Sequence, residues 1–189
     1  MRPTEILKRE HDVILLVLEA AERELDSVKD TGEVDSDRIG KMLDFFSNFA
    51  DRCHRAKEEN LLFASVQERG MPRHSGPLAT MLVEHDEGRA RVQAAADALP
   101  RAAQGDPSAV TAVQESLFAY IELLRAHIGK EDGILYPVAD QLLSAQDQRL
   151  LEERLERAEA EEMGDGVRQK YYTLAHELAG GSPTPHGGR

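Results

Sequence analysis

The sequence contains a single cysteine, no tryptophan and only 5% aromatic residues. One cysteine, Cys53, excludes an internal disulfide framework and a metal site built from several thiolates. Because aromatic side chains are scarce, the core must consist mainly of leucine, valine, isoleucine and alanine. Hydrophobic residues make up 41% of the 189 positions, which is enough for one buried core and predicts a single domain, with room for an appendage.

Long apolar runs and an excess of positive charge are also absent. No segment approaches the roughly 18 apolar residues that a membrane span needs, and the first residues lack the apolar stretch of a signal peptide. The formal net charge of −12 is unfavourable for binding nucleic acid or an anionic membrane. We therefore expect a cytoplasmic protein, a monomer or a homodimer, with neither a nucleic acid nor a membrane as its partner.

Apolar residues recur at helical spacing in four long segments, residues 4–29, 37–68, 78–103 and 108–140. Stretches rich in glycine, proline and aspartate separate them, and Pro137 is expected to bend the end of the fourth. The short connections favour antiparallel neighbours, so the sequence predicts an all-α, up-down-up-down four-helix bundle over residues 1–140. One or two further helices are expected over 141–179, followed by a disordered tail at 180–189.

The second and fourth segments contain the same ten-residue pattern. "HRAKEENLLF" begins at His54, and "HIGKEDGILY" begins at His127. The first and third segments share "EHD", with His11 and His85 in the middle. Each half of the chain therefore contributes a helix with one histidine and a helix with a His-x-x-x-Glu pair, which indicates internal duplication of a helical hairpin.

Residues four apart lie on the same face of a helix, so each His-x-x-x-Glu pair can reach one point. One such pair is expected by chance in a chain with 35 acids, and a lone histidine on an apolar stripe is more often a hydrogen-bonded core residue than a ligand. Burying four imidazoles and two carboxylates in one small bundle is nevertheless unfavourable unless a metal compensates them. The candidate metal ligands are His11, His54, Glu58, His85, His127 and Glu131.

Imidazole and carboxylate ligands suit iron, manganese or zinc. Six side chains are too many for one tetrahedral zinc but suit two ions. If both glutamates bridge, the protein fills about eight positions on two ions that each favour about six. Water, hydroxide or a bridging oxygen would occupy the rest, with room for a small ligand such as O2, peroxide or NO.

This arrangement resembles the haemerythrin-like, or HHE cation-binding, domain. The resemblance rests on His11, His54-x-x-x-Glu58, His85 and His127-x-x-x-Glu131. The resemblance covers residues 4–140. It implies a four-helix bundle that holds two iron ions in a non-haem, oxo- or hydroxo-bridged di-iron centre, with Glu58 and Glu131 as bridges.

The chain departs from the family's classical oxygen carriers at one position. Those proteins have another histidine four residues after the third-helix histidine, where this sequence has Arg89. The difference puts reversible O2 carriage in doubt. The sequence is more similar to bacterial members associated with peroxide, NO or iron handling.

Other residues near the candidate ligands have less certain roles. The family often places an aspartate five residues after the last histidine, so Asp132 is an alternative to Glu131, which we prefer because it aligns with Glu58. Tyr120 and Tyr136 are either core aromatics or phenols that hydrogen-bond a bound oxygen species.

Charged neighbours of the ligands are expected to lie elsewhere. Adjacent residues on a helix point about 100° apart, so the acids next to the histidines should pair with solvent or between helices. Lys57 and Lys130, at matching positions of the repeat, should form surface helix pairs.

Three functions follow from these observations. The leading one is a di-iron protein that reacts with peroxide, O2 or NO in oxidative or nitrosative stress or iron handling, with a catalase-like activity among the possibilities. The second is a module that binds or stores O2, NO or iron without turnover. The third is a structural bundle without metal, whose histidines are satisfied by hydrogen bonds.

Overall fold

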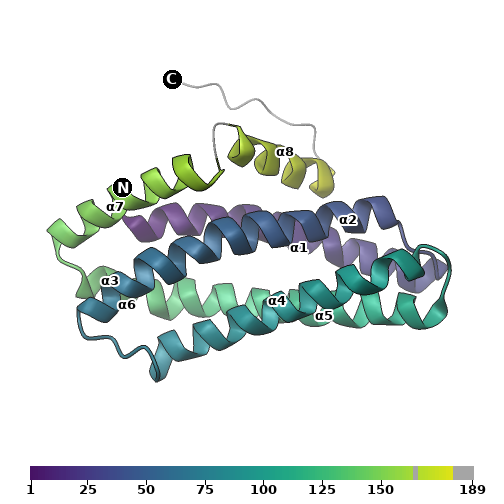
Figure 1. The fold of residues 1–189 in the computed structure, drawn as a ribbon, viewed down its shortest axis with the longest axis horizontal. Helices are drawn as coiled ribbons and strands as arrows, with labels where there is room; N and C mark the ends of the chain where they lie inside the picture. The colour runs from purple at the N-terminus through teal and green to yellow at the C-terminus, as the bar shows by residue number, and fades with distance from the viewer. Residues whose placement is uncertain (164–165, 181–189) are drawn as a thin grey trace.

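The computed structural model describes residues 1–163 and 166–180, and within them every regular element is a helix, which confirms the predicted all-helical fold. Apart from Gly180, the predicted disordered tail lies outside the described residues. Four long helical stretches run along the long axis of the molecule (Figure 1). They comprise α1 (Pro3–Thr31); α2 (Ser36–Phe45), η1 (Phe46–Arg55), η2 (Glu58–Leu62) and α3 (Phe63–Glu68); α4 (Gly76–Ala102); and α5 (Pro107–Lys130), η3 (Glu131–Leu135) and α6 (Tyr136–Leu142).

Local sequence signals set the ends of these stretches. Gly32 ends α1 in the left-handed conformation, with φ of 74°, which glycine adopts without steric cost. The Asp35 side chain accepts a hydrogen bond from the backbone N–H of Arg38 and so caps α2. Asp106 caps α5 in the same way, and Pro107 follows in the first turn, where a missing N–H does no harm.

Parts of the second and fourth stretches are π-helical, which the sequence analysis did not foresee. The segments η1, η2 and η3 have the wider i→i+5 hydrogen bonding of a π-helix, while the flanking residues are α-helical. Such wider turns are frequent at functional sites. His54 lies in η1, Glu58 begins η2, and Glu131 begins η3.

The buried apolar residues form two clusters that follow each other along the long helical stretches. In α1, Leu7 belongs to the smaller cluster and Ile14 to the larger one, and His11 lies between them in the chain. The same order holds elsewhere, with His85 between Met81 and Val92, and with His127 and Glu131 between Leu124 and Leu135. The candidate ligands therefore occupy the boundary between the two apolar clusters.

Two further helices, α7 (Ala145–Met163) and α8 (Val167–Ala179), lie along one side of the long stretches (Figure 1). Leu151 and Leu155 of α7 belong to the smaller apolar cluster, and Tyr171 of α8 belongs to the larger one. Arg69, after α3, donates to both carboxylate oxygens of Asp147 at 2.9 and 2.5 Å. These helices therefore share the core of the long stretches. Among the described helices, none is long and apolar enough to cross a membrane.

Candidate metal centre

The structure brings all six candidate ligands together in the core. Each is at most 3% exposed. Their donor atoms form two groups in which the atoms lie within 4.8 Å of one another, and the two groups share Glu58 and Glu131. The first group adds His11 and His54, and the second adds His85 and His127, so the duplicated halves of the sequence meet at one place.

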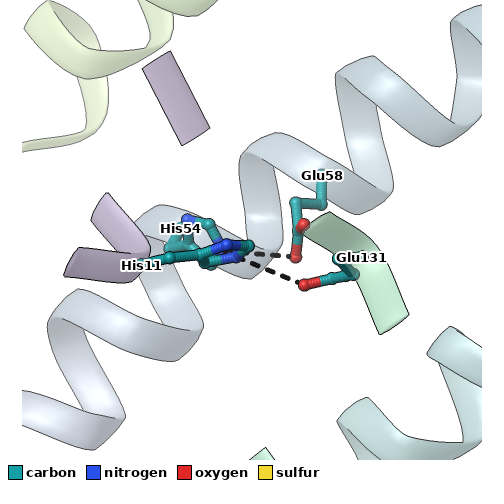
Figure 2. A group of neighbouring side chains, drawn as sticks. All are labelled: His11, His54, Glu58 and Glu131. Carbon is teal, nitrogen blue, oxygen red and sulfur yellow. Dashed lines mark hydrogen bonds and ion pairs between the residues drawn. The ribbon is translucent and has the colours of Figure 1, made fainter. Parts of the chain in front are cut away.

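In the first group, the Nε2 atoms of His11 and His54 face each other at 3.0 Å. Both carboxylates approach this pair (Figure 2). Glu131 Oε2 lies 3.3 Å from His11 Nε2, and Glu58 Oε2 lies 3.5 Å from His54 Nε2.

The second group repeats this geometry. The Nε2 atoms of His85 and His127 also lie 3.0 Å apart. Glu58 Oε2 is 3.5 Å from His85 Nε2, and Glu131 Oε1 is 3.0 Å from His127 Nε2. Each carboxylate thus lies next to one imidazole of each pair, which is the position that a bridging ligand would occupy.

The outer nitrogen of every one of these imidazoles faces a carboxylate from another helix. The distances from Nδ1 to oxygen are 3.0 Å for His11–Asp132, 2.9 Å for His54–Glu10, 2.6 Å for His85–Glu59 and 2.7 Å for His127–Glu84. A carboxylate on Nδ1 fixes the orientation of the ring and its tautomer, as is usual for metal-ligating histidines.

A cation accompanies each of these four carboxylates. Lys57 donates to Glu10, Lys130 donates to Glu84, and Arg89 donates to Glu59 at 2.7 Å. Lys8 Nζ lies 3.9 Å from Asp132. Although burial opposes it, the hydrogen bonds from His85 and Arg89 lower the pKa of Glu59 to about 2. This carboxylate therefore stays charged and holds the Nδ1 proton of His85.

The hydrogen-bonding pattern shows that these residues fit a bound cation. With Nδ1–H donated to a carboxylate, a neutral imidazole presents its lone pair at Nε2. Two such lone pairs at 3.0 Å repel unless a positive charge lies between them. In addition, Glu58 Oε2 and both oxygens of Glu131 are buried and accept no hydrogen bond within the described residues, so metal ligation would satisfy them.

The pKa values of the metal-free chain show the same preference for positive charge. Burial alone would lower the pKa of His11, but the adjacent carboxylates of Asp132 and Glu131 raise it to about 10. Burial would likewise raise the pKa of Glu131, but the imidazoles of His11 and His127 hold it well below its usual range. Without a metal, protons supply the positive charge that the cluster requires.

The two halves of the centre differ by one hydroxyl group. Tyr136 stacks on His11, with ring centroids 5.5 Å apart, and Phe63, at the same position of the repeat, stacks on His85 at 5.8 Å. The Tyr136 hydroxyl donates to Glu58 Oε1 at 2.5 Å and lies 3.3 Å from His11 Nε2. Burial and the neighbouring carboxylates raise the pKa of Tyr136 well above its usual value, so the phenol keeps its proton.

The remaining candidates lie outside the six-residue cluster. Asp132 faces the outer nitrogen of His11 and has 35% of its side chain exposed, whereas Glu131 is fully buried. This placement supports the preference for Glu131 as a ligand, which remains a prediction. Arg89 donates to Glu59, Asp51 and Asp86. The Tyr120 hydroxyl makes no hydrogen bond within the described residues and so does not reach the centre.

Sequence reasoning missed most of the surrounding charges. It expected Lys57 to form a surface helix pair, and this was wrong: Lys57 is 2% exposed and pairs with the buried Glu10 of α1. Glu10 and Glu84, each directly before a histidine, do pair between helices, but their partners include imidazoles, those of His54 and His127. The internal repeat is the sequence feature that could have indicated these lysine–glutamate pairs, because Lys57 and Lys130 occupy equivalent positions in it, as do Glu10 and Glu84.

Comparisons with known proteins place the chain in a cation-binding family. The model of a family described as the hemerythrin HHE cation binding domain matches residues 2–139. Two similar curated proteins are uncharacterized protein Rv1995 of Mycobacterium tuberculosis (strain H37Rv) and uncharacterized protein Mb2018 of Mycobacterium bovis. Each is 22% identical over 161 residues, which is 85% of this chain and 62% of the relative. The chain therefore spans less than two thirds of the length of these relatives, and no solved structure matches it.

Proposed function

Because this chain belongs to the haemerythrin HHE cation-binding family, we propose that it is a non-haem di-iron protein that binds and reacts with peroxide, O2 or NO. We also propose that residues 1–140 form the family's up-down-up-down four-helix bundle, and that the protein serves oxidative or nitrosative stress or iron handling in the cytoplasm. The observation that carries the proposal is the pair of facing Nε2 atoms in each half, 3.0 Å apart, next to buried carboxylate oxygens without hydrogen bonds.

The donor set divides naturally between two ions. His11 and His54 would hold one, His85 and His127 would hold the other, and Glu58 and Glu131 would contribute to both. When bound, iron supplies redox chemistry and Lewis acidity towards a small oxygen-containing or nitrogen-containing ligand. Four imidazoles and two bridging carboxylates fill about eight of roughly twelve positions, which leaves room for such a ligand.

The burial of the site restricts its ligand to a small molecule. Each of the six residues is at least 97% shielded from solvent, and together they occupy the boundary between two apolar clusters. A large or strongly charged substrate would have to displace this packing. Peroxide, O2 and NO are small and carry no net charge at neutral pH, so they can enter such a core at low cost.

Tyr136 gives the centre a hydrogen-bond donor on the side of His11 and His54. Its hydroxyl orients Glu58 through the 2.5 Å hydrogen bond and has Nε2 of His11 at 3.3 Å. Phe63 offers no such group on the side of His85 and His127. We infer that Tyr136 holds the Glu58 carboxylate in place on the side of His11 and His54, a role that Phe63 cannot fill on the other side.

Anaerobic reconstitution with ferrous iron tests the proposal. We expect about two irons per chain in the unaltered protein, clearly fewer in His54→Ala, and no loss in the control His176→Ala, since His176 lies on α8 and outside the cluster. Fewer than one iron per chain, with zinc bound in its place, would contradict the di-iron centre.

Separate additions of peroxide, O2 and NO to the iron-loaded protein then distinguish the functions. Rapid O2 evolution from peroxide, reduced in His54→Ala, identifies a peroxide-decomposing enzyme. A reversible optical change on adding and removing O2 or NO identifies instead a binding module without turnover. If none of the three reagents changes the optical spectrum, the proposed reactivity is wrong.

A further inference from the structure

A cavity of about 450 Å3 lies between η1, α4 and α5, and its lining has a net charge opposite to that of the whole chain. Three arginines, Arg52, Arg55 and Arg89, line it, together with the single acid Asp51. The protein as a whole carries a net charge of −12. A concentration of cations around a concave site in such a chain points to an anionic ligand.

Arg55 is the most unusual of these residues, because its charge is buried and only weakly compensated. Its side chain is 3% exposed, and its nearest carboxylate oxygen, Asp51 Oδ1, is 4.0 Å away. The Arg55 guanidinium donates to the backbone oxygen of His85 at a long 3.4 Å, and it makes no other hydrogen bond within the described residues. Asp51 is already engaged by Arg89 at 2.8 Å. A buried charge with so little pairing is costly unless a ligand completes it.

The backbone is shaped to admit this guanidinium. A Cβ atom at Gly88 would lie 2.8 Å from both terminal nitrogens of Arg55, which is closer than real Cβ contacts. Glycine at this position of α4 therefore allows the Arg55 side chain to lie against the helix backbone next to the cavity. Such close approach is a typical reason for a glycine inside a helix.

Tyr120 adds an unused donor to the same cavity. Its side chain is 1% exposed, and its hydroxyl has no hydrogen-bond partner within the described residues. Burial raises the pKa of Tyr120 to about 12, so the hydroxyl stays protonated and can donate. The Arg55 guanidinium carbon lies 6.0 Å from the centre of the Tyr120 ring, and both residues line the cavity.

We propose that this cavity binds a small organic carboxylate, whose oxygens accept hydrogen bonds from Arg55 and Tyr120. Guanidinium groups match the planar geometry of carboxylates, and a carboxylate would pair with the weakly compensated Arg55 and accept from the unpartnered Tyr120 hydroxyl. Phe46 and Val92 provide an apolar wall for the organic part. The volume is within the range of pockets for small organic ligands and exceeds what an inorganic anion fills.

Calorimetric titration with benzoate, on the full-length iron-loaded protein, tests the site. We expect saturable binding, at least about tenfold tighter than that of the neutral analogue benzamide, because a charged acceptor strengthens these hydrogen bonds. Tyr120→Phe removes only the unpartnered hydroxyl and should weaken benzoate binding about 3- to 10-fold. The matched control Tyr171→Phe, on α8, should leave it unchanged.

Gly88→Ala provides an independent perturbation, because the added Cβ displaces the Arg55 guanidinium at the end of its flexible side chain. We expect this variant to fold and to bind benzoate at least about fivefold more weakly, given the loss of a charge-assisted hydrogen bond. The proposal is wrong if benzoate shows no saturable binding, or if both variants bind it like the unaltered protein. Tighter binding of inorganic phosphate than of benzoate would overturn the assignment to an organic carboxylate.

This proposal does not depend on the metal centre. The same titration distinguishes benzoate binding in the cavity from benzoate binding at the metal. If benzoate changes the iron spectrum equally in the unaltered protein and in both variants, it binds at the metal and the cavity assignment fails. If the protein binds no iron but Tyr120→Phe still weakens benzoate binding, the cavity assignment stands while the proposed di-iron function fails.

Discussion

Replacement of Tyr136 by phenylalanine isolates the one hydroxyl by which the two halves of the centre differ. The change leaves the ring on His11 but removes the 2.5 Å hydrogen bond to Glu58 Oε1. Glu58 would then be a fully buried carboxylate with both oxygens unpartnered within the described residues. Hydrogen bonds to charged groups contribute about 1.5–3 kcal/mol. For a chain of this size, that corresponds to a decrease in Tm of about 3–12 °C in the metal-free protein.

Differential scanning calorimetry of metal-free and iron-loaded protein measures this effect. In the iron-loaded protein the decrease should be smaller, because ligation also compensates the Glu58 carboxylate. Tyr120→Phe is the matched control: the same atom is lost from an equally buried tyrosine, but its hydroxyl has no partner to leave behind within the described residues. Its Tm should remain within about 2 °C of the unaltered protein, since removing an unsatisfied buried group costs little.

Equal decreases in the two variants would refute this reasoning, because they would show that the cost comes from lost packing and not from Glu58. A Tyr136→Phe protein as stable as the unaltered chain would show that the carboxylate of Glu58 is protonated or solvated in the metal-free state.

Three further predictions concern the surroundings of the centre and the added helices. Glu10→Gln weakens the contact between Glu10 and Nδ1 of His54 and should lower the iron affinity about 10- to 100-fold, measured by competition with a chelator. The variant of an exposed neighbour, Asp12→Asn, should leave the iron affinity unchanged. Asp147→Asn should lower Tm at pH 7, and the difference should vanish as the pH falls to about 2. The reason is that Arg69 and Ser144 lower the pKa of Asp147 from 3.8 to about 2, so its stabilising effect is present above pH 4 and lost below it. Leu151→Ala, at a position 1% exposed, should reduce the free energy of unfolding by about 2–5 kcal/mol in urea denaturation, and a loss below about 0.5 kcal/mol would show that α7 is not part of the cooperative core.

The sequence predicted the helical segments and placed the candidate ligands on shared helix faces, because both depend on spacing along one helix. A histidine and a glutamate four residues apart share a helix face whatever the rest of the fold does, and the internal repeat doubled that signal. The capping roles of Asp35 and Asp106 at the starts of α2 and α5 were not predicted, and the expected segments began two residues later, at 37 and 108.

What the sequence did not reveal depends on contacts between helices. Lys57 is buried because Glu10 reaches it from α1, and no pattern within the second segment indicates that contact. The π-helical turns at His54, Glu58 and Glu131 were also missed, because one extra residue in a turn leaves the apolar pattern nearly unchanged. The cavity beside Arg55 requires Gly88 from α4, and that glycine looks like any other in the sequence.

The central claim is that two metal ions lie between the two histidine pairs. X-ray diffraction from crystals of the iron-loaded protein, recorded on both sides of the iron absorption edge, tests it most directly. The account predicts two anomalous peaks per chain, one next to His11 and His54 and the other next to His85 and His127, with Glu58 and Glu131 contacting both. A single peak, or iron bound at His74 or His176 while the four core imidazoles remain metal-free, would contradict it.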